Sequence, residues 1–401
     1  MNTYIIDAIR TPIGNFGGSL KSIRTDDLAA ITIKEIIKRT KIDPSKIDDV
    51  ILGCANQAGE DNRNVARMAL LLAGLPYTVP GETINRLCSS GMSSVIHAHR
   101  AIAARDGDIF IAGGVENMTR GPWVISKVSQ AYGRDAKMYD SSFGWRFINP
   151  KMKKMYGTEG MGETAENLSE KYNISREDQD LFAYNSQKKA AKAQSTGRFN
   201  EEIITVEIPQ RKKDPIIFSK DEFIKENTSL EILSKLRTVF RENGTVTAGN
   251  SSGLNDGSAA MLIASEKAVN DHELIPKCKI LSSSVVGVEP RIMGIGPVKA
   301  SNKALEKANL NINDIDIIEI NEAFASQSLA CIREWGLDDD DPRINPNGGA
   351  IALGHPLGAS GTRILQTAAI ELEKRNKKFA LVTMCIGVGQ GYATIIENVN
   401  I

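Results

Sequence analysis

The two ends of this chain follow the same pattern, and this internal duplication constrains the fold more than any other feature. Residues 33–53 align without a gap on residues 301–321. Both segments predict an amphipathic helix, a short polar turn and an apolar strand, which covers residues 50–52 in one copy and 317–320 in the other. A repeat of this kind indicates two half-domains of similar topology.

The units that follow each copy also correspond. A glycine-rich turn at residues 88–91 leads into a predicted helix and then a strand at residues 109–112. In the second copy a turn at residues 354–361 leads into a helix and a strand at residues 379–382. Strands alternating with helices predict an α/β fold built from layers.

The middle of the chain differs from both copies. It is polar, and it predicts helices over residues 162–172 and 178–193, with Ser175 as N-cap and Asp178 three residues later. A segment of this length with its own helices is too long for a loop, so we expect an insertion laid over the active face. The predicted division is residues 1–118 with 246–272 for the N-terminal half, 119–245 for the insertion and 273–401 for the C-terminal half.

Composition and the terminal residues indicate which kinds of binding partner and which cellular compartment to expect. Lys plus Arg (49) equals Asp plus Glu (49), which does not favour nucleic acid or an anionic membrane as a partner. No apolar run approaches about 18 residues, the start does not read as a signal peptide, and the last residues are not a peroxisomal address. The five cysteines are scattered without a C-x-x-C pair, so we expect no disulfide framework and no metal site. A reducing cytoplasm fits best.

Cys88 is the first candidate catalytic residue. It opens a turn directly before a predicted helix, where free N–H groups are expected to lower the pKa of a thiol. The alternative is a buried structural cysteine, which is a common fate of free thiols.

Three further residues lie in segments with room for a ligand. His355 is flanked by Gly354 and Pro356, and an imidazole there can accept a thiol proton or donate to an oxyanion. Cys385 precedes Gly387 in a glycine-rich turn whose N–H groups can approach a carbonyl; a dinucleotide loop would need an acidic residue about 20 positions later, and the chain ends first. Asn321 follows a predicted strand, where its amide is either a ligand for water or a carbonyl, or a helix N-cap.

Taken together, these motifs resemble the thiolase family. The resemblance rests on residues 85–91, 113–118, 247–253, 321–325, 348–361 and 385–391, and it extends from residue 7 almost to the last residue. It implies a five-layer α-β-α-β-α sandwich of duplicated halves with an inserted loop domain. It also implies a homodimer or homotetramer that acts on acyl-CoA, with coenzyme A as co-substrate and no permanently bound cofactor.

The resemblance also assigns roles. Cys88 matches the acyl-accepting nucleophile, His355 the base that activates it, and Cys385 the acid/base at the acetyl α-carbon. Asn321 matches the residue that holds a water in one oxyanion hole, and the N–H groups of Cys88 and Gly387 would form a second hole. The positions expected along coenzyme A are Ser252 and Met161 at the pantetheine arm and Lys225 toward the nucleotide.

Departures from the family pattern narrow the activity. Gly160 stands where acetoacetyl-CoA-forming thiolases have a histidine before Met161, and Val388 replaces a glycine. The runs at residues 53–64 and 144–150 look most like thiolases for 3-oxoadipyl-CoA. We therefore expect reversible, CoA-dependent and degradative cleavage of a 3-oxoacyl-CoA. The alternatives are an acetyl-CoA acetyltransferase, a 3-oxoacyl-ACP synthase and a non-catalytic acyl-CoA-binding relative.

A dicarboxylate substrate would need a cation for its distal carboxylate. The insertion offers Arg134, Lys137 and Arg146 near aromatic residues. The alternative for each of them is an ordinary surface charge.

Overall fold

The structure is a computed structural model that describes residues 2–401. Its strands form two half-sheets. The N-terminal half-sheet has the order β1 (Thr3–Arg10), β10 (Asn255–Ser265), β5 (Ile109–Asn117), β3 (Asp49–Gly53) and β4 (Gly81–Ile84). The C-terminal half-sheet has the order β12 (Ile317–Ile320), β13 (Phe379–Ile386), β14 (Gln390–Asn398) and β11 (Cys278–Gly287). The halves join where β1 pairs with β11 over Tyr4 with Lys279 and Ile5 with Cys278, and the short β2 (Gly14–Asn15) pairs with β10.

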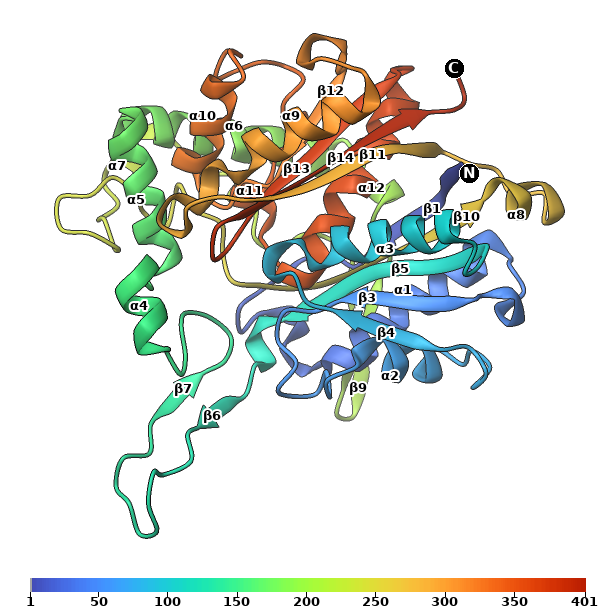
Figure 1. Cartoon of the computed structure of the whole chain (residues 1–401), viewed down its shortest axis with the longest axis horizontal. Helices are drawn as coiled ribbons and strands as arrows, with labels where there is room; N and C mark the ends of the chain where they lie inside the picture. Colours follow the sequence, from blue (N-terminus) through green and yellow to red (C-terminus); the bar gives the residue numbers. More distant parts are fainter. Residues whose placement is uncertain (1) are drawn as a thin grey trace.

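Helices cover both outer faces and fill the space between the half-sheets (Figure 1). Helices α1 (Thr25–Thr40) and α2 (Val65–Leu72) cover the N-terminal half-sheet, with α8 (Glu266–Asp271) after β10. Helices α3 (Ser90–Ala104) and α12 (Leu357–Arg375) pack against each other in the middle. Helices α9 (Gly296–Ala308) and α10 (Ala325–Glu334) cover the C-terminal half-sheet. The predicted five-layer sandwich is therefore confirmed.

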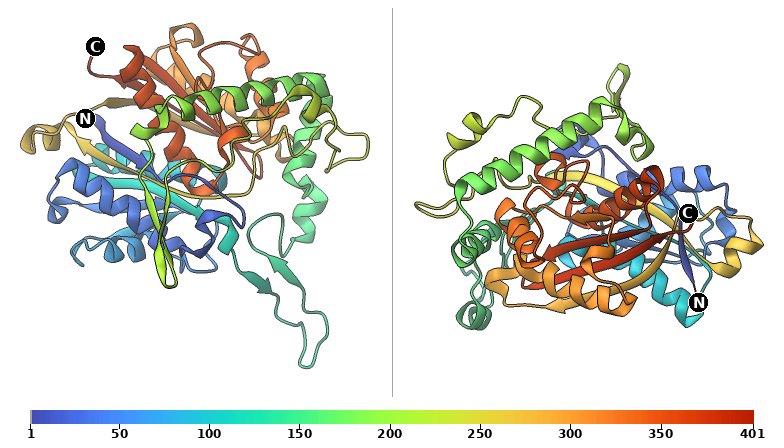
Figure 2. Two further views of the ribbon diagram at one scale, coloured as in Figure 1. Left: turned by 180° about the vertical axis from the view of Figure 1, so that it is seen from behind. Right: turned by 90° about the horizontal axis from the view of Figure 1, so that it is seen from above.

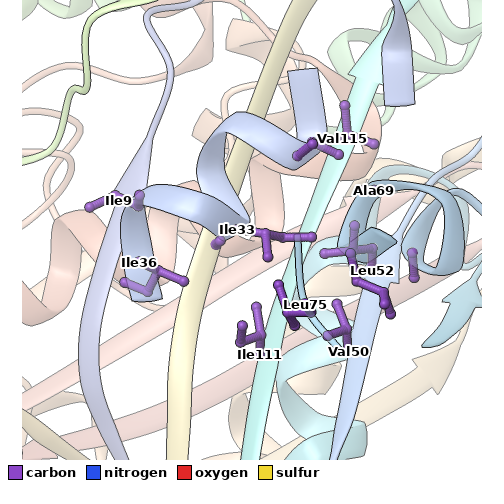
Figure 3. Close-up of a cluster of buried hydrophobic side chains, with 14 of the residues drawn as sticks. Ile9, Ile33, Ile36, Val50, Leu52, Ala69, Leu75, Ile111 and Val115 are labelled. Atoms are coloured by element: carbon purple, nitrogen blue, oxygen red, sulfur yellow. The ribbon is translucent and has the colours of Figure 1, made fainter. Parts of the chain in front are cut away.

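Each helical layer has its own apolar cluster. Figure 3 shows the first, where Ile33 and Ile36 of α1 face Val50, Leu52 and Ile111 of the sheet. The central cluster joins α3 and α12 to both half-sheets. Almost every residue of α12 up to Leu372 is buried, because a helix between two sheets has no face toward solvent.

The duplication is visible in the topology. In the first half, β3 pairs in parallel with β5, and α3 lies between them in the chain. In the second half, β12 pairs in parallel with β13, and α12 is the last helix before β13, after α10 and the short α11 (Ala350–Leu353). Both connections are βαβ crossovers, so the repeat in the sequence corresponds to a repeat in structure.

The inserted segment carries small elements of its own. They are β6 (Trp123–Ile125), β7 (Met138–Asp140), α4 (Pro150–Tyr156), α5 (Met161–Tyr172), α6 (Arg176–Ser195), β8 (Val206–Gln210), β9 (Lys213–Phe218) and α7 (Leu230–Ser234). Ser175 caps α6 in a capping box with Asp178, as predicted. The β6–β7 hairpin projects from the body as an arm (Figure 1), and α6 lies across the C-terminal half (Figure 2). The residue boundaries of the three predicted units stay a prediction.

Within residues 2–401, no helix has both the length and the apolar character needed to cross a membrane.

Candidate active site

Cys88 lies in a tight 3₁₀ turn, Leu87–Ser89, directly before α3. Side chains on either side close this turn. Asn85 Oδ1 accepts from the N–H of Leu87 (2.9 Å), and the Ser90 hydroxyl donates to Leu87 O (2.7 Å) and accepts from Arg86 N (2.9 Å). Leu87 has φ 49°, a left-handed conformation that is uncommon for a bulky non-glycine residue. Cys88 is therefore held in place by its immediate neighbours.

The thiol of Cys88 accepts from the backbone N–H groups of Gly387 and of Cys88 itself. Removal from water raises the pKa of Cys88. The two N–H groups lower this pKa, but their effect is smaller than that of burial, so the pKa stays above its ordinary value. The predicted lowering of this pKa is therefore wrong, because burial outweighs the helix start. The same two N–H groups are those expected to form the second oxyanion hole.

His355 is buried, and its tautomer follows from its hydrogen bonds. Its Nδ1 lies 2.6 Å from Ser360 Oγ, and the Ser360 hydroxyl donates its only proton to Pro356 O (2.9 Å). Nδ1 must then carry the proton and donate it to Ser360. Nε2 is left with a free lone pair, which is what a general base for a thiol requires.

The surroundings keep this imidazole neutral. Burial, together with the positive charge of Arg363, lowers the pKa of His355 to about 3. Arg363 lies on α12, two turns from His355, and its Nη1 is 3.8 Å from Glu319 Oε2 in a fully buried pair. In the resting protein His355 is therefore an acceptor at Nε2.

Asn321 is fully buried at the end of β12, and its Nδ2 lies 3.4 Å from His355 Nε2. Helix α10 begins after Phe324, so Asn321 is not the N-cap that the sequence also allowed. Its Oδ1 has no hydrogen-bond partner within residues 2–401. A buried amide oxygen of this kind needs a polar partner, and a water or a substrate group next to His355 would supply it.

Cys385 ends β13 in an apolar environment formed by Met161, Met293, Ala323 and Phe324. Burial raises its pKa well above the ordinary value, and the nearby Cys88 raises it further. Gly387 follows in the turn before β14, where a Cβ would lie 3.5 Å from Leu87 and 3.6 Å from Met161. Cys385 and Gly387 therefore belong to the same site as Cys88.

Three elements converge on the Cys88 turn, since α12, β13 and α3 all contact it. The starts of α3 and α12 can approach each other closely only because residue 91 is glycine. A Cβ on Gly91 would clash with the carbonyl oxygen of Gly358. Among the described residues no hydrogen bond joins Cys88 directly to His355 or Cys385. Catalytic hydrogen bonds often tighten only when substrate binds.

One supporting residue received no role from the sequence. Glu116 is buried at the end of β5, and its carboxylate accepts from the N–H groups of Ala55 (2.9 Å), Asn56 (3.0 Å) and Gly358 (2.9 Å). Burial raises its pKa to about 7, although these N–H groups act to lower it. Glu116 ties the turn after His355 to the loop after β3. Its signal in the sequence was an acid within an otherwise apolar strand.

The three residues expected along coenzyme A have different surroundings. Met161 begins α5 and contacts the Cys385 cluster. Ser252 donates its N–H to Ala323 O (3.0 Å), which joins the run 247–253 to the run 321–325. Lys225 is exposed and lines a cavity of about 580 Å³ together with Phe223, Leu233, Leu236 and Gly249. In residues 2–401, no three His, Cys, Asp or Glu side chains are grouped as metal ligands.

Comparison with known proteins agrees with this arrangement. The sequence matches the thiolase N-terminal domain over residues 3–267 and the thiolase C-terminal domain over residues 274–398. The chain belongs to the thiolase family, and its activity is that of an acyltransferase.

Individual relatives are similar over their whole lengths. A beta-ketoadipyl-CoA thiolase of Acinetobacter baylyi is 55% identical over 99% of this chain and 100% of its own. A 3-oxoadipyl-CoA/3-oxo-5,6-dehydrosuberyl-CoA thiolase of Escherichia coli is 56% identical over 99% of both chains. The crystal structure of the Bacillus anthracis acetyl-CoA acetyltransferase superimposes with a TM-score of 0.93, at 40% identity over 99% of both chains.

Proposed function

We propose that the protein cleaves a 3-oxoacyl-CoA to acetyl-CoA and a shortened acyl-CoA through an acyl group carried on Cys88. The observation that carries this proposal is the shared placement of the Cys88 thiol and the Gly387 N–H. An acyl carbonyl bound to that sulfur lies within reach of the same N–H.

In the first half of the reaction, Cys88 Sγ attacks the 3-oxo carbon and its proton passes to His355 Nε2. The resting pair is neutral, since the Cys88 pKa is raised and the His355 pKa is about 3. We therefore expect the proton to leave as the sulfur–carbon bond forms rather than beforehand. Once protonated, Nε2 becomes a donor to the thioester oxygen of the substrate, beside Asn321, and this oxygen carries the negative charge when the enolate forms.

The bond between the α-carbon and the 3-oxo carbon then breaks, and acetyl-CoA leaves as an enolate. Cys385 donates its thiol proton to the enolate carbon and becomes a thiolate. That thiolate takes the proton of incoming coenzyme A, whose sulfur attacks the acyl carbon on Cys88. His355 returns its proton to Cys88, so both cysteines end as thiols.

We propose 3-oxoadipyl-CoA as the substrate. Two relatives at 55–56% identity carry the names beta-ketoadipyl-CoA and 3-oxoadipyl-CoA thiolase. A further support is that the two runs are close in the fold, because Asn56 of the run 53–64 donates from Nδ2 to Ser141 Oγ (2.9 Å), three residues before the run 144–150.

We propose that coenzyme A is a co-substrate with its pantetheine arm along Met161 and Ser252 and its nucleotide toward Lys225. We also propose a cytoplasmic homodimer or homotetramer without a permanently bound cofactor. The exposed Trp123, Ile125, Tyr132 and Met138 on the arm support an oligomer, since such patches are uncommon on monomers. Sedimentation of the purified protein tests the oligomeric state.

The activity is tested by mixing the protein with 3-oxoadipyl-CoA and coenzyme A. We expect acetyl-CoA and succinyl-CoA in equal amounts. With 3-oxoadipyl-CoA alone, mass spectrometry should find the succinyl mass on the peptide that contains Cys88. An adduct on another residue, or equal use of acetoacetyl-CoA, would contradict the proposed mechanism or the proposed substrate, respectively.

A further inference from the structure

We propose that the guanidinium of Arg146 binds the distal carboxylate of the substrate and so determines selectivity for a dicarboxylic 3-oxoacyl-CoA. This inference rests on the proposed function. It follows from where residues 141–149 are anchored and from the partners that Arg146 has.

The first anchor lies on the Cys88 side of the site. Asn56 Nδ2 donates to both the hydroxyl and the carbonyl of Ser141 (2.9 and 3.3 Å). The neighbouring Ala55 carbonyl accepts from Asn85 Nδ2 (3.0 Å), and Asn85 closes the turn that contains Cys88. Residue 141 is therefore connected to the nucleophile turn through two hydrogen-bonded steps.

The second anchor lies on the Cys385 side. Trp145 Nε1 donates to Glu159 O (3.0 Å), two residues before Met161. Met161 packs against the Cys385 cluster. Residues 141–149 are therefore tied at Ser141 to the segment beside the nucleophile turn and at Trp145 to the segment before Met161, and Arg146 immediately follows the second anchor.

The guanidinium of Arg146 has no acidic partner among residues 2–401. Its Nη1 donates only to Ser141 O (3.2 Å), and within residues 2–401 no carboxylate lies within salt-bridge distance of it. Arg24 and Arg120, in contrast, both pair with Glu60. Arg146 is also only partly exposed, so a carboxylate that replaces water beside it would gain a strong charge-assisted hydrogen bond.

The other predicted cations are placed differently. Arg134 and Lys137 are exposed and lie in the loop 126–137 that joins β6 to β7. Arg63 lies in the run 53–64 and is exposed as well. Arg146 alone among these four combines partial burial with anchors on both sides of the site.

A single cation can determine the selectivity between a dicarboxylic and a neutral 3-oxoacyl group. A 3-oxoadipyl group and a 3-oxohexanoyl group have the same carbon chain and differ only in the terminal carboxylate. A fork of guanidinium N–H groups matches a carboxylate in both shape and charge. Loss of that contact should reduce the use of the dicarboxylate without affecting the neutral chain.

The experiment measures kcat/KM for 3-oxoadipyl-CoA and for 3-oxohexanoyl-CoA in the full-length protein and four variants. Arg146→Gln removes the charge and keeps a donor for Ser141 O, whereas Arg146→Lys keeps a charge without the fork. Arg134→Ala and Arg63→Ala are the matched controls. We expect Arg146→Gln to lose about 10- to 150-fold on 3-oxoadipyl-CoA, the range for a hydrogen bond to a charged group, with little change on 3-oxohexanoyl-CoA. Arg146→Lys should lose less.

The other outcomes separate this inference from the proposed substrate. An equal loss on both substrates would show that Arg146 is merely structural, and a selective loss in Arg63→Ala or Arg134→Ala would place the carboxylate elsewhere. Either result overturns the inference while the substrate stands. A wild-type protein that uses 3-oxohexanoyl-CoA as well as 3-oxoadipyl-CoA would refute the substrate itself.

Discussion

The hydroxyl oxygen of Ser360 lies 2.6 Å from His355 Nδ1 and accepts its proton. This contact leaves Nε2 with a free lone pair, so in the proposed mechanism Ser360 positions the base through the other side of its ring. Ser360 stands five residues after His355, in the first turn of α12, and nothing in the sequence singled it out.

The variant Ser360→Ala tests this positioning role. Without this acceptor, the His355 ring is no longer held in a single orientation and a single tautomer. We therefore expect kcat to fall about tenfold with KM almost unchanged, as for the loss of one buried hydrogen bond. Steady-state kinetics checks the result. Ser328→Ala is the control, because the Ser328 hydroxyl is buried without a partner within residues 2–401. Equal kcat values in both variants would remove Ser360 from the mechanism.

The variant Cys385→Ala should separate the two halves of the reaction. We expect cleavage and α-proton exchange to fall by about 10²–10⁴-fold, because the general acid is gone, whereas transfer of an acyl group from acyl-CoA to Cys88 continues. Deuterium exchange and mass spectrometry measure these steps. Cys331→Ala is a matched variant, since Cys331 is also buried with a pKa raised to about 12. Near-normal cleavage by Cys385→Ala would refute the role.

The pH dependence of alkylation reports the state of Cys88. Only the thiolate reacts, and the raised Cys88 pKa means that little thiolate exists at neutral pH. The rate with iodoacetamide should therefore rise about tenfold per pH unit from pH 6 to 9. The measurement uses Cys385→Ala, so that one reactive cysteine remains in the site. A plateau below pH 7 would instead indicate a thiolate–imidazolium pair.

Glu319 makes the stability of the protein depend on pH. Burial raises its pKa from 4.5 to about 8, although Arg363 acts to lower it. Between these two values the folded state binds a proton that the unfolded state has released, so the free energy of unfolding falls as the pH rises. Relative to Glu319→Gln, the wild type should lose stability from about pH 4.5 to 8 and change little above. Denaturant titrations across this range measure the difference, and an opposite slope would contradict it.

The sequence by itself determined the main helices and strands, and it marked the candidate reactive residues. Helix α6 follows from the cap at Ser175, and β12 covers the predicted residues 317–320. Cys88, His355 and Cys385 were identifiable as candidates because each has a glycine within three positions, next to a predicted helix or strand. These signals are local: periodicity, capping and turn chemistry act between residues a few positions apart.

Only the tertiary structure decided how the residues act together. Asn321 faces His355 instead of capping α10, and Glu116 joins two turns far apart in the chain. The pKa of Cys88 is raised and not lowered as predicted for the same reason, since desolvation depends on every element packed around the thiol. The position of Arg146 likewise depends on Asn56 and Glu159, which hold Ser141 and Trp145 just before it in the sequence. Contacts between residues far apart in the sequence produce no periodic pattern in it, because they form only when the half-sheets, the central helices and the insertion have packed together.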